Sequence, residues 1–452
     1  MKVLLINPYI YDFTAFDLWL RPLGLMYIAS VLEKYTDSEL YWIDTLDRFQ
    51  EGAYTENESL KKHNHKNSSG KYHRELVDRP EIFKSTPRNY CRYGIPLESL
   101  HKKLENIPPV DLIFMTSLMT YWIDGVTFTI DILKQKFPCA KIVLGGILPG
   151  LVREERLKEL IPADYFIRGY GEQRALEIIR EYGGTVYPHP DFSDINEIPF
   201  PAVKYLSNRD FAPLLTSRGC PMHCTYCASA LLNPRFIERD PQSVYNEIRF
   251  NHDTYRTGNF VIFDDALLIN KQKRFLKLFR EIRENLDLHF YTPNGLHTRE
   301  IDKETAQLMF DSGFKMLRLS FESTDPSILS RSSDKVSTNQ MIAAVENLEV
   351  AGYNRKDIDV YLLFGIPGQN LGHLLDVLEF VKSLGVNPHL SIYSPVPGTQ
   401  DFIRLQESGI VSDPVDLYET NKIYFLYNKT GFTYEEIKNI KDRFTAYSSG
   451  LK

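Results

Sequence analysis

The stretch SRGCPMHCTYC, residues 217–227, decides the fold of this 452-residue chain. It contains three of the chain's five cysteines, Cys220, Cys224 and Cys227, in the spacing C-x3-C-x2-C. Cysteines crowded in this way in a reduced compartment hold a metal more often than a disulfide. Three thiolates in one tight loop can hold three corners of a cubane iron–sulfur cluster, and no fourth cysteine lies nearby in the sequence. The fourth iron would then be open to a substrate, as in catalytic zinc sites that keep one position free.

A zinc site is the main alternative interpretation of this loop. His223 would join the three cysteines in a Cys3His site, but it is adjacent to Cys224, which gives a poor geometry. Structural zinc sites also usually take their ligands from two separated pairs. Inert core cysteines are the remaining alternative. Cys91 and Cys139 are too few for an auxiliary four-cysteine cluster, so we expect them to be bystander thiols.

Strand-like and helix-like segments alternate from this loop toward the C-terminus. Strands are expected at 212–217, 259–264, 288–292, 316–321, 359–364 and 389–393, separated by helical patterns such as 271–284, 339–351 and 374–384. Six strand–helix units predict a partial (β/α)6 barrel over residues 211–400, with its active site at the C-terminal strand ends. A helical C-terminal region is expected over residues 401–452.

Residues 1–182 carry a second alternating series. Strands are expected at 2–6, 40–43, 112–116, 141–144 and 165–167, with helices at 23–33, 125–136 and 173–181. This alternation predicts an α/β domain with a doubly wound parallel sheet, whose ligands bind at the carboxyl ends of the strands. The proline-containing segment 183–210 is expected to be the linker between the two domains.

A long insertion at about residues 50–104 interrupts the first domain and lacks clear periodicity. Between Lys61 and Arg92 there are nine Lys or Arg residues against three Asp or Glu residues. A structureless loop of this length is usually functional or disordered. We interpret it as a solvated loop or as a cap that orders over an anionic ligand. A metal site based on His63 and His65 would have too few ligands.

Composition and charge exclude several classes of protein. Apolar residues make up 43% and charged residues 25%, a balance that is typical of soluble globular proteins and not of disordered chains. The net charge of −6 lacks the basic footprint of a nucleic-acid-binding protein. No apolar run reaches the roughly 18–20 residues of a transmembrane helix, and the N-terminal apolar run is too short for a signal peptide. We therefore expect a cytoplasmic protein.

The cysteine loop, with the aromatic Tyr226 before its last cysteine, resembles the signature of the radical S-adenosylmethionine (SAM) enzymes. The resemblance implies that Cys220, Cys224 and Cys227 bind a [4Fe–4S] cluster and that SAM chelates its open iron. In that family the reduced cluster cleaves SAM to a 5′-deoxyadenosyl radical, which abstracts a substrate hydrogen. The resemblance also implies an external electron donor such as flavodoxin or ferredoxin.

A SAM site at the strand ends is a second implication of the resemblance. Asp264 and Asp265 stand where the family often carries a Gly-Gly-Glu type motif. Because adjacent residues of a strand point to opposite faces, we expect at most one of the two to face the ligand. The other SAM-binding residues that the resemblance implies are Tyr226, Asn294, Ser320, Glu322, Gly365, Ile366 and Pro367.

The first domain resembles the cobalamin-binding domain that is fused to many radical SAM enzymes. Glycines after its strands would let a bulky ligand approach the backbone. The cobalamin-binding residues implied are Ser117, Leu118, Thr120, Gly145, Gly146, Gly169, Tyr170, Gly171 and Glu172. Many cobalamin domains carry a histidine ligand after the first strand, but the segment from Asn7 to Leu23 has none. A histidine-ligated cobalt at that position is therefore excluded, although the radical SAM subset often lacks that histidine.

Together the two resemblances imply a cobalamin-dependent radical SAM enzyme that methylates an unactivated carbon of a small-molecule or extended organic substrate. Within the enzyme class, the alternative is a rearrangement, cyclisation or carbon–carbon coupling without methyl transfer. Outside it, the alternative is a non-catalytic zinc- or cobalamin-binding scaffold or sensor.

Overall fold

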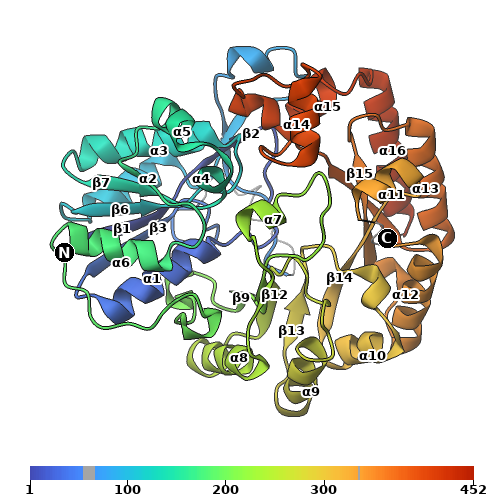
Figure 1. Cartoon of the computed structure of the whole chain (residues 1–452), viewed down its shortest axis with the longest axis horizontal. Helices are drawn as coiled ribbons and strands as arrows, with labels where there is room; N and C mark the ends of the chain where they lie inside the picture. Colours follow the sequence, from blue (N-terminus) through green and yellow to red (C-terminus); the bar gives the residue numbers. More distant parts are fainter. Residues whose placement is uncertain (54–66, 334–335, 452) are drawn as a thin grey trace. The chain divides into compact units, whose positions relative to one another are not determined.

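The structure is a computed structural model that describes residues 1–53, 67–333 and 336–451. The chain divides into two compact units, Met1–Phe211 and Ala212–Lys452 (Figure 1). No helix in the described ranges is long and apolar enough to cross a bilayer.

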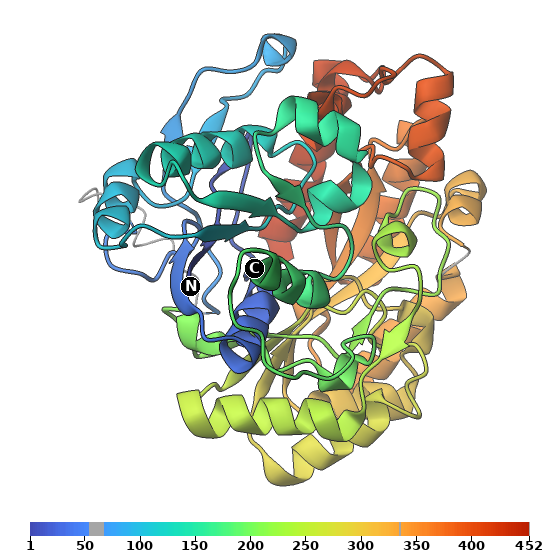
Figure 2. The ribbon, with the colours of Figure 1, turned by 60° about the vertical axis from the view of Figure 1, so that its left-hand side comes forward.

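A five-stranded parallel sheet forms the centre of the first unit. Its strands, in the order β3-β1-β6-β7-β8, are β1 (Lys2–Asn7), β3 (Glu39–Asp44), β6 (Leu112–Met115), β7 (Lys141–Leu144) and β8 (Tyr165–Phe166). The helices of this unit are α1 (Leu23–Tyr35), α2 (Leu97–Glu105), α3 (Ile123–Lys136), α4 (Ile147–Leu151), α5 (Glu154–Leu160) and α6 (Glu172–Glu181). Helices α1 and α6 pack side by side (Figure 2). The expected doubly wound sheet is confirmed, and its strand order reverses between β1 and β6, where ligands of such sheets bind.

The described part of the insertion is more ordered than the sequence predicts. Strands β4 (Arg74–Leu76) and β5 (Cys91–Tyr93) join β2 (Ile10–Asp12) in an antiparallel sheet of order β2-β5-β4. The rings of Phe13, Phe83 and Tyr90 pack against one another with centroids 4.9–5.3 Å apart. Three-residue strands are too short to show a period, so the sequence pattern missed this small aromatic core. His63 and His65 lie outside the described residues.

The segment 183–210, which we expected to be a linker, packs on the first unit. The ring of Tyr205 stacks on Trp42 with a centroid distance of 5.0 Å, and its hydroxyl donates to the Glu33 carboxylate at 2.5 Å. The ring of Phe192 packs against Tyr35 at 5.6 Å. These aromatic contacts make the segment part of the first unit.

A six-stranded sheet forms the centre of the second unit, and its strands follow the order of the chain. They are β9 (Phe211–Leu214), β12 (Asn259–Ile262), β13 (His289–Tyr291), β14 (Phe314–Glu322), β15 (Ile358–Phe364) and β16 (Asn387–Ile392). The pairings from β12 to β16 are parallel, which confirms the strand–helix repeat of the predicted partial barrel.

Helices connect these strands and continue beyond the last one, as the sequence predicts. Those before β16 are α7 (Ser229–Leu232), α8 (Pro241–Tyr255), α9 (Phe275–Asn285), α10 (Lys303–Asp311), α11 (Pro326–Arg331), α12 (Thr338–Ala351) and α13 (Leu371–Ser383). Those after it are α14 (Gln400–Glu407), α15 (Lys422–Asn428) and α16 (Tyr434–Leu451). The ends of α12 follow from its sequence, because Ser337 and Gln340 form a capping box and Gly352, at φ +117°, ends the helix.

Candidate active site and cofactor-binding edge

The cysteine loop begins at a sharp turn that only glycine accommodates well. It follows β10 (Ser217–Arg218), which pairs with β11 (Ile237–Glu238). Gly219 has φ +84°, and a Cβ on it would lie 2.9 Å from the carbonyl oxygen of Arg235. The glycine therefore lets the chain turn from the strand pair into the loop that carries the three thiols.

Two helices hold the middle of the cysteine loop. The N–H of Thr225 donates to the carbonyl oxygen of Arg331 in α11 at 2.9 Å, and its carbonyl oxygen accepts from the N–H of Asp401 in α14 at 3.0 Å. The Arg331 guanidinium in turn donates to the buried Asp401 carboxylate at 2.5 Å and to the carbonyl oxygen of Pro367 at 2.9 Å. This ion pair fixes both backbone contacts of the loop.

Replacing Asp401 with alanine is expected to loosen the cysteine loop. The change leaves the Arg331 guanidinium, whose side chain is 20% exposed, without its carboxylate, and breaking such a pair costs about 3 kcal/mol of the unfolding free energy. We expect a lower calorimetric melting temperature and faster loss of iron to a chelator from the reconstituted protein. Arg404→Ala is the matched control, because Arg404 contacts the same carboxylate from a 61% exposed position. Equal iron loss from both variants would contradict the role of the Arg331–Asp401 pair.

The three thiols line one cavity of about 530 Å³ at the carboxyl ends of the strands. Cys224 is buried, Cys220 is half-buried and Cys227 is exposed. The lining residues are Cys220, Met222, Cys224, Tyr226, Cys227, Ser229, Asp265, Pro293, Asn294, Gly295, Ser320, Glu322, Tyr361, Leu390, Ser391, Ile392 and Lys422. Among the described residues, no three His, Cys, Asp or Glu side chains form a group suited to a single metal ion. The three cysteine ligands of a cubane cluster each bind a different iron atom. They can therefore line a cavity without converging on a single point, as the ligands of one metal ion do.

Polar groups lie close to the sulfur atoms. The Sγ of Cys220 is 3.9 Å from Nε2 of the buried His297, and the N–H of Ser229 donates to the Sγ of Cys227 at 3.4 Å. The thiol of Cys224 donates to the carbonyl oxygen of Ser332 at 3.5 Å. Such outer contacts orient metal ligands and adjust the charge on their sulfur atoms.

Of the two aspartates after β12, the structure places Asp265 in the cavity and Asp264 outside it. The Asp264 carboxylate is buried and accepts from the Thr216 backbone N–H at 2.7 Å, from the Ser217 hydroxyl at 2.5 Å and from the Arg274 guanidinium at 2.9 Å. Its acceptor positions are thus used to join β9 to β12. We therefore correct the predicted SAM contact at Asp264 and keep only Asp265.

The other polar residues predicted at the strand ends do line the cavity. Asn294 is oriented by donating to the carbonyl oxygen of Phe263 at 2.9 Å. Ser320 and Glu322 share the cavity face although the pairing register shifts between them. Glu322 has φ +68°, a left-handed conformation that costs a non-glycine residue about 1 kcal/mol or more. Strain of this kind is concentrated at functional sites, which favours a role for this carboxylate.

Tyr226 lines the same cavity next to the buried Cys224 thiol. Burial raises the pKa of its hydroxyl far above the ordinary value, and the Glu322 carboxylate and the neighbouring thiols raise it further. The side chain is therefore a neutral phenol over the whole physiological pH range.

The segment of Gly365, Ile366 and Pro367, predicted to contact adenine, does not line this cavity. Ile366 is buried in a core cluster with Phe402 and Phe425. The N–H of Gly365 and the carbonyl oxygen of Pro367 are hydrogen-bonded to other protein groups. The segment forms a structural turn, so the structure does not support the predicted SAM contact.

Sequence reasoning missed several polar lining residues, among them Ser229, Tyr361 and Lys422. The hydroxyl of Ser229 donates to the Asp265 carboxylate at 2.6 Å. The sequence could have indicated Ser229, because it lies two residues after Cys227. Tyr361 lies within β15, whose side chains alternate between the two faces of the sheet, and the sequence does not indicate which face lines a cavity. Lys422 lies at the start of α15 in a region without motifs, and no sequence signal marks it.

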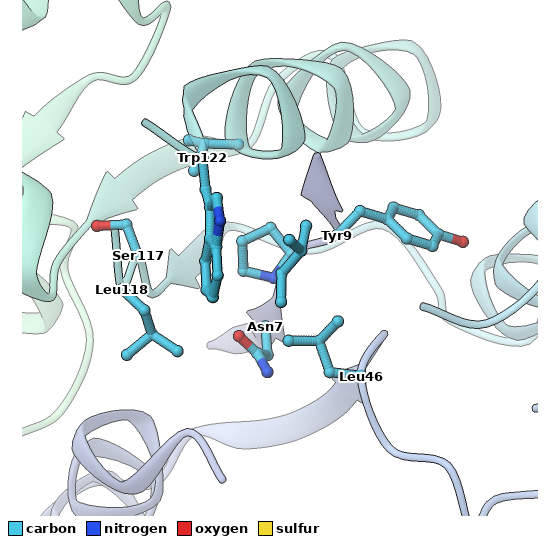
Figure 3. Close-up of a pocket in the computed structure, with 9 residues that line it drawn as sticks. Asn7, Tyr9, Leu46, Ser117, Leu118 and Trp122 are labelled. Carbon is cyan, nitrogen blue, oxygen red and sulfur yellow. The ribbon is translucent and has the colours of Figure 1, made fainter. Parts of the chain in front are cut away.

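In the first unit, a small pocket lies at the point where the strand order reverses (Figure 3). It is lined by Asn7 and Pro8 after β1 and by Ser117 and Leu118 after β6, and the indole of Trp122 points into it. Its space is about 10 Å³, enough for little more than one water molecule. A large ligand would therefore lie on the open side of this edge and not inside the pocket.

Glycines shape the rest of this edge, and Gly146 is the most constrained of them. It has φ +94°, and a Cβ on it would lie 2.2 Å from the carbonyl oxygen of Ser117. The Ser117 hydroxyl donates to the carbonyl oxygen of Gly145 at 2.8 Å, which ties the two strand ends together. Gly169, with φ +74°, has no atom within 4 Å of the position of a Cβ, so its backbone faces open space.

The remaining predicted cobalamin residues differ in accessibility. Tyr170 is 42% exposed, and a Cβ on Gly171 would touch Ile28 at 3.1 Å. Thr120 and Glu172 are buried, so their side chains are poorly placed for direct contact. A ligand bound at this edge would therefore contact the backbone at Gly145 and Gly169 more than it would contact side chains.

Asp44, at the end of β3, is buried on the same edge. Its carboxylate accepts from the Asn7 side-chain amide at 2.7 Å and from the N–H of Leu46 at 2.9 Å. Burial, with a contribution from Asp47, raises its pKa to about 7. The folded chain thus holds a proton that the unfolded chain releases near pH 4, so this group's contribution to stability is lost as pH rises from about 4 to about 7.

Replacing Asp44 with asparagine is expected to remove this pH dependence. Relative to the wild type, the variant should gain about 2 kcal/mol of stability between pH 5.5 and pH 8.5, because the amide keeps the acceptor oxygen and cannot ionise. Calorimetry of the full chain at both pH values measures the gain as a shift in melting temperature. Asp131→Asn, at an exposed position of α3, is the control. A difference between Asp44→Asn and the wild type that is the same at both pH values would contradict the raised pKa.

Comparison with known proteins places the second unit in a family. Residues 214–381 match the family model of the radical SAM superfamily. The chain contains a radical SAM domain. The match starts in β9 and ends in α13, so this radical SAM domain includes the cysteine loop and most of the cavity wall.

Relatives extend the likeness beyond the radical SAM domain. PH0819 of Pyrococcus horikoshii, an uncharacterized methyltransferase, is 26% identical over 300 residues, which are 64% of this chain and 62% of that protein. The cytidylyl-2-hydroxyethylphosphonate methyltransferase of Streptomyces wedmorensis is 24% identical over 98% of this chain and 89% of its own length. The solved structure of the radical SAM methyltransferase TsrM from Kitasatospora setae, with cobalamin and a [4Fe–4S] cluster bound, has a TM-score of 0.65. It covers 90% of this chain and 78% of TsrM at 15% identity, a likeness of fold.

Proposed function

We propose that this chain is a cobalamin-dependent radical SAM enzyme that methylates an unactivated carbon. The observation that carries the proposal is that Cys220, Cys224 and Cys227 line one cavity together with Asp265 and Glu322, inside the radical SAM domain. Two relatives named as methyltransferases and the fold likeness to a cobalamin-binding methyltransferase support it.

The cavity residues fit a [4Fe–4S] cluster and SAM. Three soft thiolates without a fourth cysteine suit a cluster with one open iron. In this family the cluster and SAM together supply the 5′-deoxyadenosyl radical. In this chain, Asp265 and Glu322 would accept from the SAM ammonium or ribose hydroxyls, and Asn294 and Ser320 would position the nucleoside. Tyr226 would line the site as a neutral phenol.

The edge of the first sheet is suited to cobalamin because its glycines would let the cofactor approach the protein backbone. The strand order reverses there, Gly169 leaves open space where a side chain would stand, and the nearest atoms to a Cβ on Gly145 would be 4.0 Å away. Cobalamin would supply the carrier for a methyl group. Asn7, Ser117 and Leu118 form the floor of this edge, and they would set how closely the ring approaches the sheet.

The proposed function is tested by following the two products of SAM. The full chain is reconstituted anaerobically with iron and sulfide, and S-adenosylhomocysteine and 5′-deoxyadenosine are measured with and without cobalamin, in the presence of metabolite extracts. Formation of S-adenosylhomocysteine that depends on cobalamin supports methyl transfer. Formation of 5′-deoxyadenosine alone would overturn methyl transfer and favour a rearrangement, cyclisation or coupling. A colourless, zinc-loaded protein without SAM cleavage would overturn the enzyme itself.

A further inference from the structure

Lys422 is a positively charged side chain in a cavity whose other charged lining groups are the carboxylates of Asp265 and Glu322. Among the residues that line the cavity in the described part of the chain, it is the one Lys, Arg or His. Asp265 and Glu322 line the cavity from the ends of β12 and β14, whereas Lys422 enters from the start of α15, near β16. The cavity therefore has carboxylates and an ammonium contributed by different elements.

The backbone beneath Lys422 is rigid. Asn421 is fully buried, and its side-chain oxygen accepts from the N–H groups of Ile423 at 2.9 Å and Tyr424 at 3.1 Å. The preceding Thr420 accepts from the Ser394 hydroxyl at 2.6 Å through its carbonyl oxygen. The Lys422 side chain thus starts from a fixed point, which reduces the entropy lost when its ammonium binds a ligand.

Its ammonium has no carboxylate partner among the residues described by the structure, in contrast to Lys429 at the other end of α15. Lys429 donates to the Glu419 carboxylate at 2.9 Å and to the carbonyl oxygen of Ile410 at 2.8 Å. Lys422 is half-buried at the wall of the cavity, where an ammonium without an anion keeps only part of its hydration. An anion bound in the cavity would supply the missing partner.

We propose that Lys422 binds an oxyanion of the substrate, a carboxylate or a phosphonate, and so makes this enzyme selective for anionic substrates. The inference rests on the proposed function. Ser391 of β16 lines the same cavity, and its hydroxyl is a suitable second donor. Charge-assisted hydrogen bonds of this kind contribute about 1.5–3 kcal/mol, which corresponds to roughly ten- to hundredfold in affinity.

Binding of methylphosphonate to the reconstituted full chain tests the proposal. We expect Lys422→Met to weaken methylphosphonate binding, measured by phosphorus NMR, by about tenfold or more, and Lys422→Arg to retain most of it. Lys315→Met is the control, because Lys315 is exposed at the beginning of β14, the end opposite the cavity. Equal binding of methylphosphonate to Lys422→Met and to the wild type would overturn the proposal.

The SAM carboxylate is the other oxyanion that this ammonium could meet, and a second measurement separates the two. We expect the dissociation constant of SAM, from equilibrium dialysis, to stay within about twofold of the wild type in Lys422→Met. A tenfold rise in that constant would overturn the assignment to the substrate. Iron content and 5′-deoxyadenosine formation without added substrate report on the proposed function itself, and we expect both to be unchanged in the Lys315→Met control. Their absence from the wild type would mark a failure of the proposed function, independently of Lys422.

Discussion

Replacing Cys220 with alanine is expected to abolish both the iron–sulfur cluster and the cleavage of SAM. The wild-type chain should take up about four iron atoms and turn brown on anaerobic reconstitution, whereas the variant should stay nearly colourless. Two thiolates, Cys224 and Cys227, cannot hold three corners of a cubane. Formation of 5′-deoxyadenosine should fall by roughly three orders of magnitude, because residues that act as one unit lose nearly all function when one is removed. Iron analysis and chromatography of the nucleoside products measure the two effects.

A matched cysteine separates the loss of a ligand from the loss of any thiol. Cys139 is exposed in the first unit, outside the radical SAM domain, so Cys139→Ala should keep the iron content and the nucleoside yield of the wild type. The melting temperature of the two variants before reconstitution shows whether Cys220→Ala still folds. If Cys220→Ala folds and forms 5′-deoxyadenosine at the wild-type rate, the assignment of the loop as a cluster site is wrong.

The central strands of the two parallel sheets were predictable where they are buried apolar runs between polar turns. The run at 141–144 coincides with β7, and the order of the elements along the chain is enough to predict parallel sheets. The end of β12 shows the limit of this reasoning. Asp264 and Asp265 are adjacent and chemically identical, and the choice between them depends on Thr216, Ser217 and Arg274, which bind Asp264 from other elements.

Non-local contacts account for the other differences between sequence and structure. Strand β5 pairs with β2, which lies far away in the sequence, and β4 pairs with β5; three residues are too few to show alternation. Lys422 reaches the cavity because the C-terminal helices return to the carboxyl ends of the strands, about 200 residues after the cysteine loop. The turn at Gly365 has the composition of a ligand-binding loop, but its apolar side chain, Ile366, belongs to the core. Composition and spacing do not distinguish these cases.

Replacing Gly146 with alanine is expected to disrupt the edge of the first unit at which we propose that cobalamin binds. A Cβ at this position would lie 2.2 Å from the carbonyl oxygen and 2.7 Å from the nitrogen of Ser117, and φ is +94°. Backbone atoms cannot move aside as a flexible side chain can, so the ends of β6 and β7 must shift. We expect the unfolding free energy to fall by about 3 kcal/mol or more. Because the shifted residues include the floor at Ser117, the amount of cobalamin retained after gel filtration should fall by about tenfold or more.

Gly183→Ala is the control that separates backbone strain from the clash with Ser117. Gly183 also has a positive φ, +79°, but no atom lies within 4 Å of a Cβ there, so the substitution should cost only about 1 kcal/mol and leave cobalamin retention unchanged. Calorimetry measures the stability of both variants, and visible absorbance measures the cobalamin that each retains. Iron content should be the same in both, because the thiols lie in the second unit. Equal retention of cobalamin by Gly146→Ala and Gly183→Ala would show that cobalamin binding does not depend on the point at which the strand order reverses. The assignment of cobalamin to this edge would then be wrong, whereas the assignment of the cluster to the cysteine loop would be unaffected.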